Sequence, residues 1–85
     1  MEREPLSSES DALWRRLWEM WQDNHEEDVI LDSNKLADLE DEIPGLENRM
    51  KTALAYLQRA RYIQYRSGVG EEGIEPILYD VYEPR

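Results

Sequence analysis

A change of hydrophobic period near residue 62 constrains the fold of this chain more than any other feature. Before it, three apolar residues recur at offsets of four and seven, the spacing of one helical stripe: Met50, Leu54 and Leu57. From Tyr62 and Ile63 onward, apolar and polar residues alternate, as they do in a half-buried strand. A glycine-containing loop over 67–73 precedes a return strand over 77–82. The sequence therefore predicts a helix that leads directly into a β-hairpin.

A first helix is predicted near the N-terminus. It begins at Ser8 or Ser10, because either serine can cap a helix. Its apolar residues span an arc of about 160° on a helical wheel, which is wider than one packing face requires. The residues expected to face the core are Leu13, Leu17 and Met20. The tryptophans follow along the arc from the core margin outward, in the order Trp21, Trp14 and Trp18.

The tryptophans have two readings. Packing in or at the edge of the core is the simpler expectation, since the chain has three tryptophans and no phenylalanine. Tryptophan is also enriched at binding hot spots. Trp18, followed by Trp14, is therefore the candidate contact with a partner or with a second copy of the chain.

A short strand is predicted at 29–31, followed by a second helix that Asp32 or Ser33 can cap. One stripe of this helix is apolar and comprises Leu36, Leu39 and Ile43. The acids expected to face outward are Asp38, Asp41 and Glu42. Pro44 and Gly45 end the helix, because a residue before proline leaves the helical region and glycine accepts a positive φ. Pro76, in the return strand, indicates an edge strand or a bulge, since it has no N–H to donate.

The predicted order of helix, strand, helix, helix and hairpin resembles that of winged helix-turn-helix domains. The resemblance covers residues 10–83 and rests on spacing. It implies an α+β fold with three helices, a short strand and a C-terminal hairpin, the wing. It also implies binding to double-stranded DNA, with the third helix, at about residues 46–60, as the recognition helix. Residues 1–9 and 84–85 are polar and contain proline, so they are expected to be flexible tails.

Charge is distributed unevenly along the chain. Ten basic and twenty acidic residues give a net charge of −10, whereas domains that bind duplex DNA usually carry a basic surface. Residues 46–66 nevertheless hold five bases and one acid, a net charge of +4, which leaves −14 for the remainder. The positive segment coincides with the predicted third helix and the first strand of the wing. Either it is a DNA-binding face or it is simply a solvated helix face.

The outward face of the third helix carries side chains that suit a DNA groove. Opposite Met50 on the wheel lie Asn48, Thr52, Ala55 and Arg59, with Arg49, Lys51 and Tyr56 on the flanks. Asparagine can pair with adenine, threonine and alanine can meet a thymine methyl group, and arginine and lysine can reach guanine or phosphate oxygens. The resemblance implies base contacts for Asn48, Lys51, Thr52 and Ala55, and phosphate contacts for Arg49 and Arg59.

Three further DNA contacts are expected outside that helix. Asn34 and Lys35, together with free backbone amides, suit a phosphate at the start of the second helix. Arg66 can touch a phosphate from the base of the wing. The wing tip carries Glu71 and Glu72 where many winged-helix proteins carry arginine or lysine, which argues against a DNA contact there.

The sequence offers no support for catalysis. There is no cysteine, and the single histidine, His25, stands beside acids in a loop without the spacing of a zinc-protease motif. Gly68 and Gly70 lie in a hairpin and not between a strand and a helix, so they do not form a phosphate-binding motif. The N-terminus lacks the apolar core of a signal peptide. We therefore expect a soluble cytoplasmic protein that is not an enzyme and binds no metal or cofactor.

Two functions are compatible with these features. The first is a small, dimeric DNA-binding transcription regulator that uses the third helix, with the dimer contact on the first helix. The second is an acidic winged-helix module, or DNA mimic, that binds a basic protein such as a polymerase or nuclease. Phage and plasmid proteins are a plausible setting for both. Eight arginines against two lysines, with twenty acids, also resemble proteins adapted to high salt, where repulsion from DNA is screened.

Overall fold

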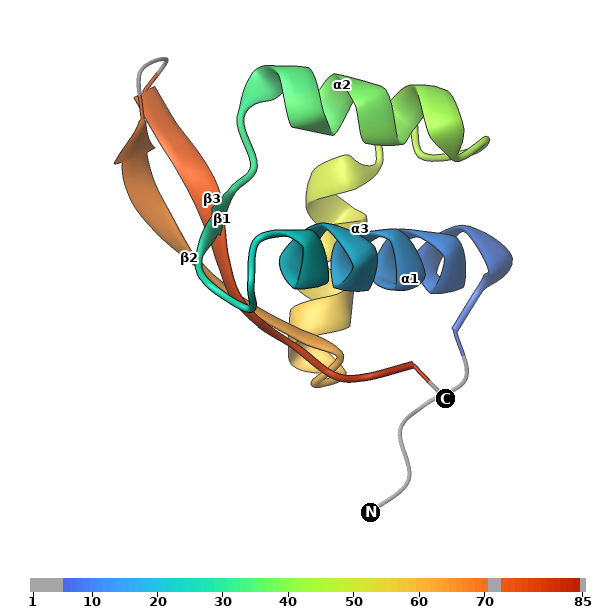
Figure 1. Cartoon of the computed structure of the whole chain (residues 1–85). Helices are drawn as coiled ribbons and strands as arrows, with labels where there is room; N and C mark the ends of the chain where they lie inside the picture. The colour runs from blue at the N-terminus through green and yellow to red at the C-terminus, as the bar shows by residue number, and fades with distance from the viewer. Residues whose placement is uncertain (1–5, 71–72, 85) are drawn as a thin grey trace.

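A computed structural model describes residues 6–70 and 73–84 of the chain. In chain order its elements are α1 (Ser8–Asp23), β1 (Val29–Ile30), α2 (Ser33–Glu42), α3 (Met50–Arg59), β2 (Ile63–Gly70) and β3 (Gly73–Val81). The helices pack together beside an antiparallel sheet, and the β2–β3 hairpin extends past them (Figure 1). The predicted α+β fold is confirmed, and the order of the elements is consistent with a winged helix. No helix in the described part of the chain is long and apolar enough to cross a bilayer.

The first two helices begin at capping side chains. Ser7 caps α1, and its Oγ accepts a hydrogen bond from the Ser10 N–H at 3.3 Å. Ser8 and Ser10, the predicted caps, both lie inside the helix. Asp32 caps α2, as one of the two predicted alternatives, and its Oδ1 accepts from the Lys35 N–H at 2.9 Å. Residues 1–5 and 85, in the predicted tails, lie outside the described residues.

A tight corner joins α2 to α3. α2 ends at Glu42, as Pro44 and Gly45 predict: Ile43 is extended, with φ −117° and ψ 103°, and Gly45 has φ 93°. The corner also buries Leu46, which is 1% exposed and which the periodicity did not single out. α3 begins only at Met50, so it is shorter than the helix predicted over about 46–60.

Side chains from the helices and the strands form one apolar core. Its most deeply buried members are Leu13, Leu17, Leu31, Leu39, Leu46, Leu57, Ile63 and Leu78. Core packing is confirmed for Trp14 and Trp21, which are 7% and 9% exposed, and Trp14 lies deeper than the margin expected of it. Met20, expected to face the core, packs against it but is only partly buried. The reason is that α1 packs against β3 as well as against α3, so its apolar arc is buried further toward Trp14.

The central strand of the sheet is β3, because the order across the sheet is β1-β3-β2. The expected edge position of Pro76 is therefore wrong. The Pro76 carbonyl accepts a hydrogen bond from the Leu31 N–H at 2.9 Å, on the β1 side. The missing proline donor thus faces the Leu31 carbonyl, just after the end of β1, and the β2–β3 ladder loses no hydrogen bond.

The hairpin is longer than predicted. It pairs from Ile63–Val81 to Gly70–Gly73, so most of the expected loop over 67–73 is strand. β3 contains one extra residue, Tyr79, because Gln64 pairs with Asp80 while Tyr65 pairs with Leu78. This bulge places Leu78 and Val81, three positions apart, on the buried side.

Candidate nucleic-acid interface

The third helix has a buried stripe and an exposed face. The buried residues are Met50, Ala53, Leu54 and Leu57. The exposed residues are Lys51, Thr52, Ala55 and Arg59, with Tyr56 half-buried at the margin. Two small side chains therefore occupy the middle of the exposed face, and a cation stands on either side of them along the helix. This shape allows the backbone of α3 to approach a large ligand closely.

Within residues 6–70 and 73–84, the cations at the α3 face lack the salt bridges that several other cations form. Salt bridges join Arg15 to Asp11 at 2.8 Å, Arg16 to Glu42 at 2.9 Å, Lys35 to Asp32 at 3.5 Å, and Arg66 to Asp28 at 3.2 Å. Arg49, Lys51 and Arg59 form no salt bridge with any residue that the structure describes. Their charges are therefore available to an external anion.

The beginning of α3 is also open. Arg49 occupies its N-cap position without a side-chain hydrogen bond, and its first turn contains no acid. α1 and α2, in contrast, are capped by Ser7 and Asp32. The first N–H groups of a helix lack partners inside the helix and favour a negative charge. The open N–H groups of α3 and the side chain of Arg49 thus reinforce each other.

Asn48 lies in the turn before α3 and not on the helix. Its φ is 62°, a left-handed conformation that asparagine tolerates better than most residues. The helical wheel that placed Asn48 beside Thr52 therefore does not describe its position, because α3 begins two residues later. Asn48 is exposed, and it precedes Arg49 at the open end of the helix.

A hollow of about 320 Å³ lies beside the exposed face of α3. Its lining comprises Arg49, Thr52, Ala53, Tyr56 and Arg59 from α3 and its N-cap, Gly45 and Leu46 from the corner, and Ser7, Glu9 and Ser10 at the start of α1. Glu9 is the one acid in this lining. The first turn of α1 therefore borders the α3 face and contributes a negative charge to its rim.

The start of α2 is less suited to a phosphate than the sequence predicts. The N–H of Lys35 donates to Asp32, and this bond, together with the charge of Lys35, lowers the pKa of Asp32 below its ordinary value of 3.8. An ionised carboxylate therefore already occupies the anion position at this helix end. Asn34 is exposed in the first turn, but the ammonium group of Lys35 is paired with Asp32.

Lys35 and Arg66 belong to a different surface from α3. Lys35 lines a hollow of about 440 Å³ together with Arg16, Asp23 and Asp28, and Arg66 bonds to the same Asp28. Neither residue lines the hollow beside α3. The structure thus brings together Arg49, Lys51, Thr52, Ala55 and Arg59, and separates Lys35 and Arg66 from them. Glu71 and Glu72, at the predicted wing tip, lie outside the described residues.

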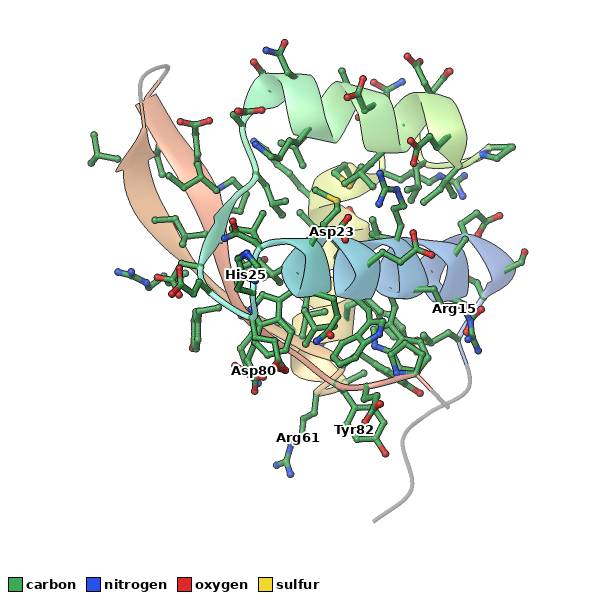
Figure 2. All side chains as sticks on the ribbon, in the orientation of Figure 1. Arg15, Asp23, His25, Arg61, Asp80 and Tyr82 are labelled. Carbon is green, nitrogen blue, oxygen red and sulfur yellow. The ribbon has the colours of Figure 1, made fainter. Side chains whose placement is uncertain are left out.

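The aromatic residues of α1 mostly serve packing. The indole N–H of Trp14 donates to the carbonyl oxygen of Tyr82 at 2.8 Å, and its ring lies 4.7 Å from that of Tyr62. Tyr82 lies below α1 at the base of the hairpin (Figure 2). Trp14 is thus a core residue and offers almost no surface to a partner. Trp18 is partly buried, with its ring 5.8 Å from that of Trp21.

Gln58 is a residue that the sequence analysis missed. Its Oε1 accepts a hydrogen bond from the Tyr65 N–H at 2.7 Å, which ties the last turn of α3 to β2. No local pattern signals this bond, since it depends on how the helix docks on the strand. Glu9 was missed for the same reason, because only the folded chain brings α1 next to α3.

The remaining polar residues in the described part of the chain form no recognisable site. His25 is exposed in the loop after α1, with φ 58° (Figure 2). No cluster of three or more potential metal ligands occurs among residues 6–70 and 73–84. Comparisons with protein-family models, with curated proteins and with solved structures give no match for the chain.

Proposed function

We propose that this protein is a small DNA-binding transcription regulator that places α3 in the major groove of double-stranded DNA. The observation that carries the proposal is the set of unpaired cations Arg49, Lys51 and Arg59 around the small residues of α3. The major groove admits one helix, and small side chains let the helix backbone approach the base edges. The order of the elements is consistent with a winged helix, in which the helix before the hairpin is the recognition helix, and this supports the role proposed for α3.

Each residue of the face has a proposed role. Thr52 and Ala55 meet thymine methyl groups, and Lys51 reaches guanine or a phosphate oxygen. Arg49 and the open N–H groups of α3 bind one phosphate, while Arg59 binds another further along the helix. Asn48 faces the bases from the turn before the helix. Lys35 and Arg66 contribute only where a phosphate displaces Asp32 or Asp28.

Fluorescence anisotropy with labelled duplex DNA tests the proposal directly. A salt series from about 20 to 200 mM should show binding that weakens steeply, because cations that neutralise phosphates release counterions. Lys51→Glu should weaken binding by more than tenfold. Arg15→Glu is the matched control: it makes the same change of charge at an exposed cation that already pairs with Asp11. Equal effects of the two variants would show that net charge alone matters and would contradict a role for α3.

A second function is favoured by the acidic surface of α2. α2 exposes Asp38, Asp41 and Glu42, and the chain outside residues 46–66 carries a net charge of −14. Such a surface suits a basic protein, for which the carboxylates would imitate DNA phosphates. If no duplex binds even at about 20 mM salt, this reading replaces the first. It predicts that the protein competes with DNA for a basic partner.

A further inference from the structure

The outer edge of β2 has backbone groups without a strand neighbour. β2 pairs only with β3 in the described sheet. Ser67 lies opposite Pro76, whose carbonyl points to Leu31 on the far side of β3. Two residues in such a pair exchange no hydrogen bonds, so the N–H and C=O of Ser67 point away from β3. The N–H and C=O of Val69, two residues later, also point away from β3. Ser67 and Val69 therefore present two donors and two acceptors along an open edge.

This open segment is bounded and uncharged. At Tyr65 the edge is closed, because the Tyr65 N–H donates to Gln58 of α3 at 2.7 Å. On the other edge of the hairpin, Pro76 interrupts the row of donors. The segment Ser67–Val69 contains neither a charge nor a proline, the features that usually protect a sheet edge from association. It is thus a short edge that another strand can extend.

We propose that two copies of this chain associate weakly through this edge, with their β2 strands antiparallel around a two-fold axis at Gly68. In this register Ser67 lies opposite Val69 of the second copy, and Val69 lies opposite its Ser67. The two residue pairs form four backbone hydrogen bonds. Gly68 meets Gly68 on the axis, where two backbones that exchange no hydrogen bond approach to about 4.5 Å. The contact is self-complementary, as a two-fold interface must be.

A second copy fits this edge because of its charge and its side chains. With a net charge of −10, two copies repel each other at long range, so a contact between them is least opposed where the facing segments are neutral, as Ser67–Val69 is. The Val69 side chain is 88% exposed in the single chain. Across the axis it lies diagonal to the half-buried Tyr65 ring of the second copy, within reach of an aromatic side chain. The pairing therefore covers the most exposed large apolar residue of the described chain.

The interface is small, so the association should be weak. Stable protein–protein interfaces bury about 1,200 Å² or more, and a contact between two three-residue segments falls below that. We therefore expect the weak, transient association that is typical of the smallest interfaces. Sedimentation velocity of the full chain, between about 10 μM and 1 mM, should then show a shift from monomer to dimer across this range. A wild-type protein that stays monomeric over the whole range would overturn the proposal.

Two proline variants locate the contact. Val69→Pro removes an outward donor from β2 without removing a hydrogen bond of the hairpin, and it should abolish the shift to dimer. Ile74→Pro is the matched control: Ile74 lies directly opposite Val69, is 80% exposed, and points its N–H to the other edge of the hairpin. It should dimerise as the wild type does. Dimerisation of Val69→Pro at the wild-type concentration would contradict the β2 contact.

Engineered cysteines test the register independently of proline, and the chain contains no native cysteine to interfere. Ser67→Cys and Val69→Cys proteins are mixed and oxidised. Residues directly opposite each other lie about 5.5 Å apart at Cα, within disulfide range, whereas identical residues are diagonal at about 7–8 Å. The mixed disulfide should therefore exceed both self-linked dimers. Preferential self-linkage of either variant, or no linkage, would rule out the axis at Gly68.

Discussion

At the scale of the residue, the position of a side chain in the fold decides what it contributes to stability. An apolar residue that stands alone among turn residues cannot be assigned to the core from the sequence pattern. Leu46 is one apolar residue among turn residues, so it belongs to no helical stripe or strand alternation. The structure buries it to 1% exposure, against the core and just before α3. It thus fixes the start of the helix that carries the proposed DNA-binding face.

Leu46→Ala should destabilise the protein strongly. Removal of a fully buried leucine side chain typically costs about 2–5 kcal/mol, through lost burial and the cavity left behind. Urea unfolding followed by tryptophan fluorescence measures the change. Ile74→Ala is the control at an 80% exposed position, with an expected effect within about 0.5 kcal/mol. Equal effects at the two positions would show that the corner does not pack as described.

Asp32 should make the stability of α2 depend on pH. Its pKa is lowered from 3.8 by the Lys35 N–H and charge, so the folded protein favours the carboxylate. This contribution is present above pH 3.8 and is lost as the pH falls through the lower, folded pKa. Asp32→Asn keeps a capping side chain but removes the charge. The wild type should therefore melt at a higher temperature than the variant at pH 7, and the difference should disappear in acid. A difference that persists in acid would exclude ionisation as the cause.

At the scale of the element, the hydrophobic periodicity of the sequence predicted the features that depend on a single helix or strand. The change of period at Tyr62 and Ile63 located the end of α3 and the start of the hairpin, and the apolar stripe of α3 predicted which face is exposed. The bulge at Tyr79 was not predictable, because it appears only when β2 and β3 are paired. The salt bridges of Lys35 and Arg66 were not predictable either. Arg66 pairs with Asp28, which is distant in the sequence, and the pairing of Lys35 with the nearby Asp32 depends on the rotamers of both side chains.

Gln58 should couple α3 to the wing. Gln58→Ala leaves the Tyr65 N–H without its acceptor, and the loss of such a hydrogen bond costs about 1 kcal/mol. Hydrogen exchange followed by NMR should show faster exchange of the Tyr65 amide, with little change in the centre of α3. Gln64→Ala, a neighbouring substitution on β2, serves as the control. Unchanged exchange at Tyr65 would mean that this hydrogen bond does not protect the edge in solution.

At the scale of the whole molecule, the fold keeps apart the basic and acidic segments of the sequence. The α3 face gathers cations without partners, while α2 exposes Asp38 and Asp41 and pairs its third exposed acid, Glu42, with Arg16. A protein with a net charge of −10 nevertheless repels DNA at long range. In the proposed function, association with DNA therefore depends on approach by the α3 face and on the salt that screens the remaining charge. The same surplus of acids opposes the compact state itself.

Salt should therefore stabilise the folded protein. Because the Debye length falls from about 10 Å at 0.1 M to about 3 Å at 1 M, repulsion among the twenty acids is largely screened in concentrated KCl. Thermal unfolding in about 0.1, 0.5, 1 and 2 M KCl should show most of the rise in melting temperature below 1 M, where the screening length changes most. A steady rise that continues to 2 M would point to exclusion of salt from the surface and not to screening. A melting temperature that does not change with KCl would show that charge repulsion is not a significant cost, and that the acidity is no adaptation to a saline interior.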